Sequence, residues 1–203
     1  MKPLKLYMDG EKVICAFTLH IDVQNGDPEF MRELVIQGLH RMEGLYETKD
    51  GPVELGVEVN ITDKFSLGAV NVRVEDKTPV IRGRYNPRIN ISRAYFGSGR
   101  KGLLKFSRYV WKKPDVFINT AGRDMENPRS RAIICGIVQH EFGHVLGFKD
   151  KYTYKKKNYR KSSPAVQDRD IMFRIGGGQE FMEYHITRLK QCAVKGKTPL
   201  RKV

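Results

Sequence analysis

NPRSRAIICGIVQHEFGHVLGFKD, residues 127–150, is the stretch that decides the fold. Asn127 followed by Pro128 is typical of a helix start, because Asn caps the first free amides and Pro suits the first helical position. Apolar residues then recur at helical spacing as far as Gly147. The stretch therefore predicts one long helix, whose apolar face consists of Ile134, Ile137, Val138 and Val145.

The end of this helix carries a pattern typical of zinc binding. His140 and His144 are four residues apart and so lie on one helix face, where both imidazoles can bind the same ion. Glu141 lies beside them. Two imidazoles and one further protein ligand leave the fourth position of Zn²⁺ open for water, which is typical of a catalytic rather than a structural site. Glu141 is then the expected general base.

Gly147 and Asp150 extend the pattern to His-Glu-x-x-His-x-x-Gly-x-x-Asp. Glycine readily takes the left-handed backbone conformation that ends a helix abruptly. The chain can then turn back, so that a side chain three residues later reaches the same metal. We expect Asp150 to be the third zinc ligand.

The extended pattern resembles the metzincin clan of zinc metallopeptidases, in which the third ligand is usually His but is Asp in members of the snapalysin type. The clan carries a methionine in a tight turn below the metal, and Met172 stands in the corresponding order. The resemblance implies a zinc-dependent endopeptidase. Members that place a tyrosine two residues after the methionine differ from this chain, which has Arg174 there. The resemblance therefore leaves open whether Tyr152, Arg174 or another group stabilises the oxyanion.

Other zincins take their third ligand from a later helix. Glu180 and Glu183 are the candidates here, with His185 on the same predicted helix. The spacing through Gly147 favours Asp150, and Glu183 is the fallback ligand. His20 and His40 have no partner ligands at a useful spacing, so we expect them to be structural.

The remaining chain predicts an α/β (α+β) fold. Alternating or β-branched residues indicate strands, and an Asp27-Pro28 cap indicates an early helix. We expect a zincin or metzincin-like fold: a twisted mixed sheet with a backing helix and an active-site helix, then a small C-terminal subdomain with the methionine turn and a final helix. The predicted strands are 13–24, 53–61, 70–74, 89–91, 103–110 and 115–119, the predicted loops are 78–102 and 149–167, and the predicted outer helices run from 28 to about 44 and from 179 to 193.

The length of 203 residues, 40% of them hydrophobic, fits a single catalytic domain, 1–203. We expect an upper subdomain of residues 1–147 and a lower one of residues 148–203. The substrate is expected to lie between them as an extended strand that pairs with an exposed sheet edge. We also expect a monomer.

The net charge of +14 favours acidic partners. We expect protein or peptide substrates of acidic character, selected by the basic loop from Lys149 to Lys161. The alternative hypothesis is a nucleic-acid-binding module with a non-catalytic zinc site, suggested by the stretch RGRYNPRINISRAYF at 82–96. That hypothesis is weaker, because no recognised reading motif accompanies the basic residues.

The start of the chain lacks the apolar run of a secretory signal, and no segment approaches membrane-spanning length. We therefore expect a cytoplasmic protein or one exported without such a signal, for which an effector or toxin role is a further hypothesis. The three cysteines, Cys15, Cys135 and Cys192, are too few and too scattered for a disulfide framework, so we expect buried thiols.

Overall fold

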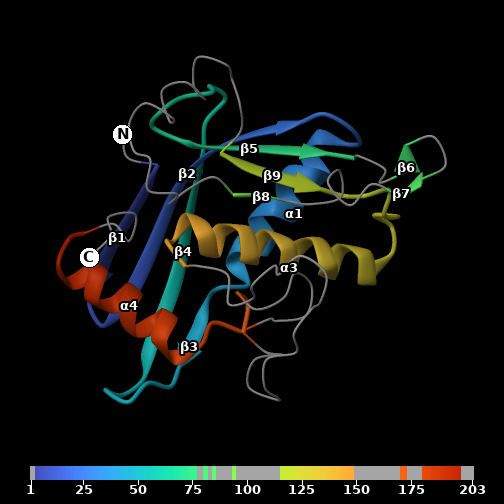
Figure 1. The fold of residues 1–203 in the computed structure, drawn as a ribbon. Helices are drawn as coiled ribbons and strands as arrows, with labels where there is room; N and C mark the ends of the chain where they lie inside the picture. The colour runs from blue at the N-terminus through green and yellow to red at the C-terminus, as the bar shows by residue number, and fades with distance from the viewer. Residues whose placement is uncertain are drawn as a thin grey trace.

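The fold is built around one long strand, β2 (Lys12–Val23), in the computed structural model of the chain (Figure 1). The structure describes residues 3–76, 80–81, 84–85, 93–94, 115–148, 170–172 and 180–197. Strand β1 (Leu4–Asp9) runs antiparallel to the first half of β2, and β5 (Val70–Glu75) runs parallel to the second half. Strand β4 (Val53–Ile61) pairs in parallel along the other edge.

Three further strands complete a seven-stranded mixed sheet. Strand β9 (Val116–Asn119) is parallel to β5, and β8 (Arg93–Ala94) is antiparallel to β9 at the end of the described sheet. Strand β3 (Gly44–Tyr46) is antiparallel to β4. The order is β3-β4-β2-β5-β9-β8, with β1 beside β2. Strands β6 (Val80–Ile81) and β7 (Arg84–Tyr85) form a separate antiparallel pair.

The first two described helices begin where their capping residues predict. Helix α1 (Pro28–His40) starts after Asp27, whose carboxylate accepts the amides of Glu29 and Phe30. Helix α3 (Pro128–Val145) starts after Asn127, whose side chain accepts the Arg129 amide. Both starts use a polar side-chain acceptor followed by proline, which satisfies amides that have no partner inside the helix.

One hydrophobic cluster joins the sheet to all three described helices. Alternate β2 residues point into it, because successive strand side chains face opposite sides. The ring of Phe17 meets that of Phe142 on α3 edge to face, with centroids 5.4 Å apart. Helices α1 and α3 cross at Gly38, where a Cβ would overlap Val138. The β2 residues in the cluster are Val13, Cys15, Phe17, Leu19 and Ile21.

Helix α4 (Glu183–Val194) packs against β1, β2 and β4 (Figure 1). Its residues Ile186 and Leu189 are fully buried and belong to the same cluster as the sheet. None of the described helices combines the length and the apolar content that crossing a membrane requires.

The mixed α+β class predicted from the sequence is confirmed, as are the strands predicted at 13–24, 53–61, 70–74 and 115–119. The sequence pattern missed β1 and β3, and it extended α1 past His40 towards Gly44, where β3 begins. The short strand predicted at 89–91 lies outside the described residues, and the nearby strand β8 spans Arg93–Ala94. The predicted strand 103–110 and loop 149–167 lie outside the described residues.

The final helix begins later than predicted, at Glu183 rather than about residue 179. Glu180 instead forms a bridge with Asp170, in which the Ile171 amide donates to the Glu180 carbonyl at 3.0 Å. Met182 is extended, and its amide donates to Nδ1 of His185 at 3.1 Å. Tertiary pairing with the 170–172 segment therefore keeps residue 180 out of the helix.

Candidate metal centre

The His-Glu-x-x-His pattern lies in the buried C-terminal half of α3. Every residue from Ile134 to Gly143 is buried, and His144 is partly exposed. His140 is 1% exposed and Glu141 is 2% exposed. Two polar side chains this deeply buried are unusual, because burial of such groups is unfavourable unless they are partnered. Their burial at adjacent positions of one helix supports a role in a functional site.

Gly147 ends the helix and supports His144. Its φ is +85°, in the left-handed region predicted from the sequence. The Phe148 amide donates to the Gly143 carbonyl and the Gly147 amide to the His144 carbonyl, both at 2.9 Å. These two bonds form a Schellman motif. The turn brings the Phe148 carbonyl oxygen to 3.0 Å from Nδ1 of His144.

His140 is supported by a different part of the chain. Its Nδ1 lies 2.6 Å from the carbonyl oxygen of Ile171, which is 31 residues away. The two imidazoles are close and nearly perpendicular, with centroids 5.0 Å apart and an interplanar angle of 87°. The pair therefore has fixed ring orientations at both positions.

These contacts assign the same tautomer to both histidines. A backbone carbonyl oxygen only accepts hydrogen bonds, so Nδ1 of His140 and of His144 must be the protonated nitrogen. In a neutral imidazole the lone pair then lies on Nε2, the nitrogen through which such a histidine would bind a metal. Histidines that bind metals commonly donate their other ring N–H to a backbone carbonyl or carboxylate in this way. The two residues thus fit a zinc ion.

Met172 lies directly beneath the motif. It is fully buried, and a Cβ on Gly143 would overlap its sulfur. The glycine between the two histidines therefore leaves the space that the methionine fills. The sequence placed Met172 only by its order in the chain, and the contact with Gly143 gives it a physical reason.

The third ligand predicted from the sequence, Asp150, lies outside the described residues, as do Tyr152 and Arg174. Within the part of the chain that the structure describes, no group of three or more His, Cys, Asp or Glu side chains forms a metal site. The rivals on the later segment have other contacts. The Glu183 carboxylate accepts the Lys49 amide at 2.8 Å, and Nδ1 of His185 accepts the Met182 amide.

The two remaining histidines make contacts of a structural kind. Nδ1 of His20 lies 3.2 Å from the Thr62 carbonyl oxygen, and its ring packs edge to face on Phe65. His40 lies 3.1 Å from the Glu43 carboxylate, where both side chains are exposed. Neither histidine belongs to a group of three or more candidate ligands among the described residues.

Asp170 and Tyr184 are residues that the sequence pattern did not single out. The Asp170 carboxylate accepts the Met172 amide at 2.8 Å and the Tyr184 hydroxyl at 2.5 Å. Asp170 could have been found from the sequence, because an Asp side chain commonly accepts a hydrogen bond from the backbone amide two residues later. Nothing in the sequence indicates Tyr184, since its contact depends on how α4 packs.

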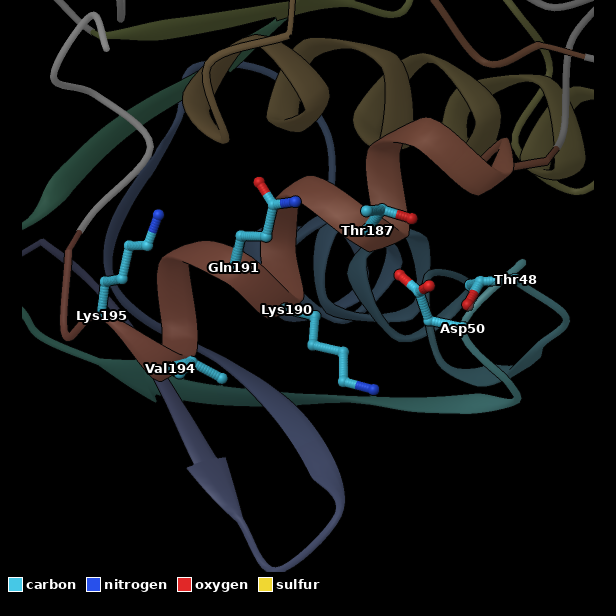
Figure 2. Close-up of a pocket in the computed structure, with 7 residues that line it drawn as sticks. All are labelled: Thr48, Asp50, Thr187, Lys190, Gln191, Val194 and Lys195. Atoms are coloured by element: carbon cyan, nitrogen blue, oxygen red, sulfur yellow. The ribbon is translucent and has the colours of Figure 1, made fainter.

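A pocket of about 310 Å³ lies elsewhere, between the loop after β3 and the outer face of α4 (Figure 2). It contains none of the motif residues. Its rim carries both charges, from Asp50 and from two lysines of the α4 region. The lining residues are Thr48, Asp50, Thr187, Lys190, Gln191, Val194 and Lys195.

Comparison with known proteins gives no match: no family model, no curated protein and no solved structure is significantly similar to this chain. The function of the chain must therefore be inferred from its residues and their geometry. Those residues are His140, Glu141 and His144 on one buried helix end, with Gly147 and Met172 around them.

Proposed function

We propose that this chain is a zinc-dependent endopeptidase. Zinc would bind to His140, His144 and Asp150, and Glu141 would act as general base. One observation carries the proposal: Nδ1 of both histidines contacts a backbone carbonyl oxygen, at 2.6 and 3.0 Å. This arrangement gives each imidazole the tautomer that a metal ligand needs.

The arrangement of elements supports a metzincin-like fold. The described sheet has four parallel strands, β4, β2, β5 and β9, and the antiparallel strand β8 lies beside β9 at one end. Helix α3 contacts both β8 and β9. The turn at Gly147 and the buried Met172 below Gly143 agree with what the metzincin resemblance implies. In this proposal, an extended substrate would pair with the β8 side of the sheet by backbone hydrogen bonds.

The proposed chemistry divides between the metal and Glu141. A bound Zn²⁺ supplies a Lewis acid that polarises a carbonyl and acidifies water. Glu141 accepts the proton of the attacking water and passes it to the leaving amine. The low exposure of Glu141, 2%, strengthens its electrostatic interactions, because the local dielectric is low.

Acidic proteins or peptides are the proposed substrates. The chain has a net charge of +14, and a field of this sign raises the rate of encounter with acidic partners. Such steering weakens as salt screens the charges. Cleavage of an acidic peptide should therefore slow more with added salt than cleavage of a neutral one.

Glu141→Gln tests the proposal. The variant should keep one equivalent of zinc and lose about 10²–10⁴-fold in the rate of casein or peptide cleavage, because a general base contributes about that factor. Glu183→Gln is the matched control, since its carboxylate contacts the Lys49 amide instead, and it should keep both zinc and activity. Asp150→Ala should lose zinc.

The outcomes separate the peptidase from a nucleic-acid-binding module with a non-catalytic zinc. Wild-type cleavage that Glu141→Gln leaves unchanged would refute the assigned role. A chain that shifts DNA or RNA in a gel, but has no peptidase activity with zinc bound, would favour the binding module. Asp150→Ala with zinc fully retained would instead refute the third ligand.

A further inference from the structure

A hydrogen-bonded connection joins α4 to the segment that contacts His140. Asp170 is 6% exposed and uses both carboxylate oxygens. Its Oδ1 accepts the Met172 amide at 2.8 Å, and its Oδ2 accepts the Tyr184 hydroxyl at 2.5 Å. One carboxylate thus ties a residue of α4 to the backbone of the 170–172 turn.

Ile171, between the two bonded positions, has both backbone groups engaged. Its amide donates to the Glu180 carbonyl at 3.0 Å, and its carbonyl oxygen accepts Nδ1–H of His140 at 2.6 Å. The direction of that carbonyl depends on the turn that Asp170 closes. A shift of this turn would therefore reorient the His140 ring or break its hydrogen bond.

We propose that Asp170 and Tyr184 are positioning residues, which hold the Ile171 carbonyl so that His140 presents Nε2 to the metal. This inference rests on the proposed zinc site. It adds a connection from the last helix of the chain to a metal ligand on α3. Neither residue touches the metal or the substrate in this role.

The surroundings of Asp170 support a fixed orientation. Burial, and then the hydrogen bond to Asp170, raise the pKa of Tyr184, so its hydroxyl remains a donor at neutral pH. Nε2 of His185 lies 3.9 Å from Oδ1 of Asp170. The His185 ring is fully buried against the rings of Phe148 and Tyr184, with centroids 4.3 and 4.0 Å away.

Tyr184→Phe is the first test, because it removes one hydroxyl and keeps the ring. Tyr46→Phe is the matched control: the Tyr46 hydroxyl donates to the Met42 carbonyl at 2.7 Å, away from the motif. Zinc affinity is measured by competition with a chromophoric chelator, and ligand geometry by the visible spectrum of the Co²⁺-loaded protein. The tautomer of His140 is measured by ¹⁵N NMR of the metal-free protein.

We expect Tyr184→Phe to weaken zinc binding about fivefold and to change the Co²⁺ spectrum, because it removes one of the hydrogen bonds that hold the 170–172 turn. Asp170→Ala should weaken binding by about 10–100-fold, the usual range for loss of a group that supports a ligand. Asp170→Asn should recover part of that loss, since it keeps one acceptor oxygen. Tyr46→Phe should match the wild type.

The inference would be overturned if Tyr184→Phe and Tyr46→Phe had the same zinc affinity, the same Co²⁺ spectrum and the same His140 tautomer. If the wild type still bound zinc in that case, the proposed function would remain intact. A wild-type chain that binds no zinc would overturn the proposed function itself. In that case, loss of the Nδ1–H tautomer of His140 in Tyr184→Phe would still support the positioning connection, and its retention would refute it.

Discussion

His144 and His140 lie one turn apart on α3, but the backbone carbonyls that contact them lie at different distances along the sequence. The carbonyl that contacts His144 belongs to Phe148, four residues later, and Gly147 places it there. The carbonyl that contacts His140 belongs to Ile171, 31 residues away, and its position depends on the packing of α4 and Met172. One imidazole is oriented locally and the other by tertiary structure. The two supports should therefore respond to different substitutions.

Met172→Ala should disturb the distant support most. Truncation of a fully buried methionine leaves a cavity and lowers the free energy of unfolding by about 2–5 kcal/mol. It also removes the side chain that packs on Gly143, so zinc affinity should fall as well. Met42→Ala is the control, because Met42 is equally buried but has no contact with the motif among those described. Denaturant unfolding and zinc titration of both variants make the comparison, and equal zinc affinities would argue against support from Met172.

Gly147→Ala should disturb the local support. An L side chain in the left-handed region costs about 1–2 kcal/mol, which should appear as a lower free energy of unfolding together with weaker zinc binding. Gly196→Ala offers a close control, since Gly196 has φ +59° and forms the same two-bond motif at the end of α4. We expect similar destabilisation from both variants but a loss of zinc affinity only from Gly147→Ala. If both variants bind zinc equally well, the turn is not needed for His144.

Differences in the rate of thiol labelling are the smallest effect that we expect, and each cysteine reports on a different element. Cys135 on α3 is buried, and burial raises its pKa, as it does for Cys15 on β2. Cys192 on α4 is partly exposed. Because the thiolate is the reactive form, a disulfide reagent at pH 8 should label Cys192 first and the other two slowly. Cys192→Ser should remove the fast phase, and a fast phase that persists would mean that α3 or β2 opens more readily than α4.

The same difference in distance explains which parts of the site could be predicted from sequence. The shared helix face of His140 and His144, the left-handed Gly147 and the two capped helix starts all depend on residues within about five positions. Short-range rules describe such features well. The Ile171 carbonyl, the Asp170 contacts and the late start of α4 depend on chain segments that meet only after folding, and no local pattern encodes them.

The sheet follows the same rule. Strands with a strong alternating pattern, such as Val53–Ile61, were predicted with correct bounds. Strand β3 was not, because three residues are too few to show a period and its pairing with β4 determines its conformation. Strand β1 was missed too, although its six residues alternate between buried and more exposed positions at the start.

The two partners that share one edge of β2 set an order for folding. Strand β1 reaches β2 through a short turn that includes Gly10, so this hairpin can form within microseconds. The pairing of Leu19 with Val70 closes a loop of about 50 residues, and the entropic cost of closing this loop is larger than that of the short β1–β2 turn. The N-terminal half of β2 should therefore be structured before its C-terminal half. The contact of His140 with the Ile171 carbonyl closes a loop of 31 residues, so the orientation of this ring should also be fixed after the local contacts of α3 have formed.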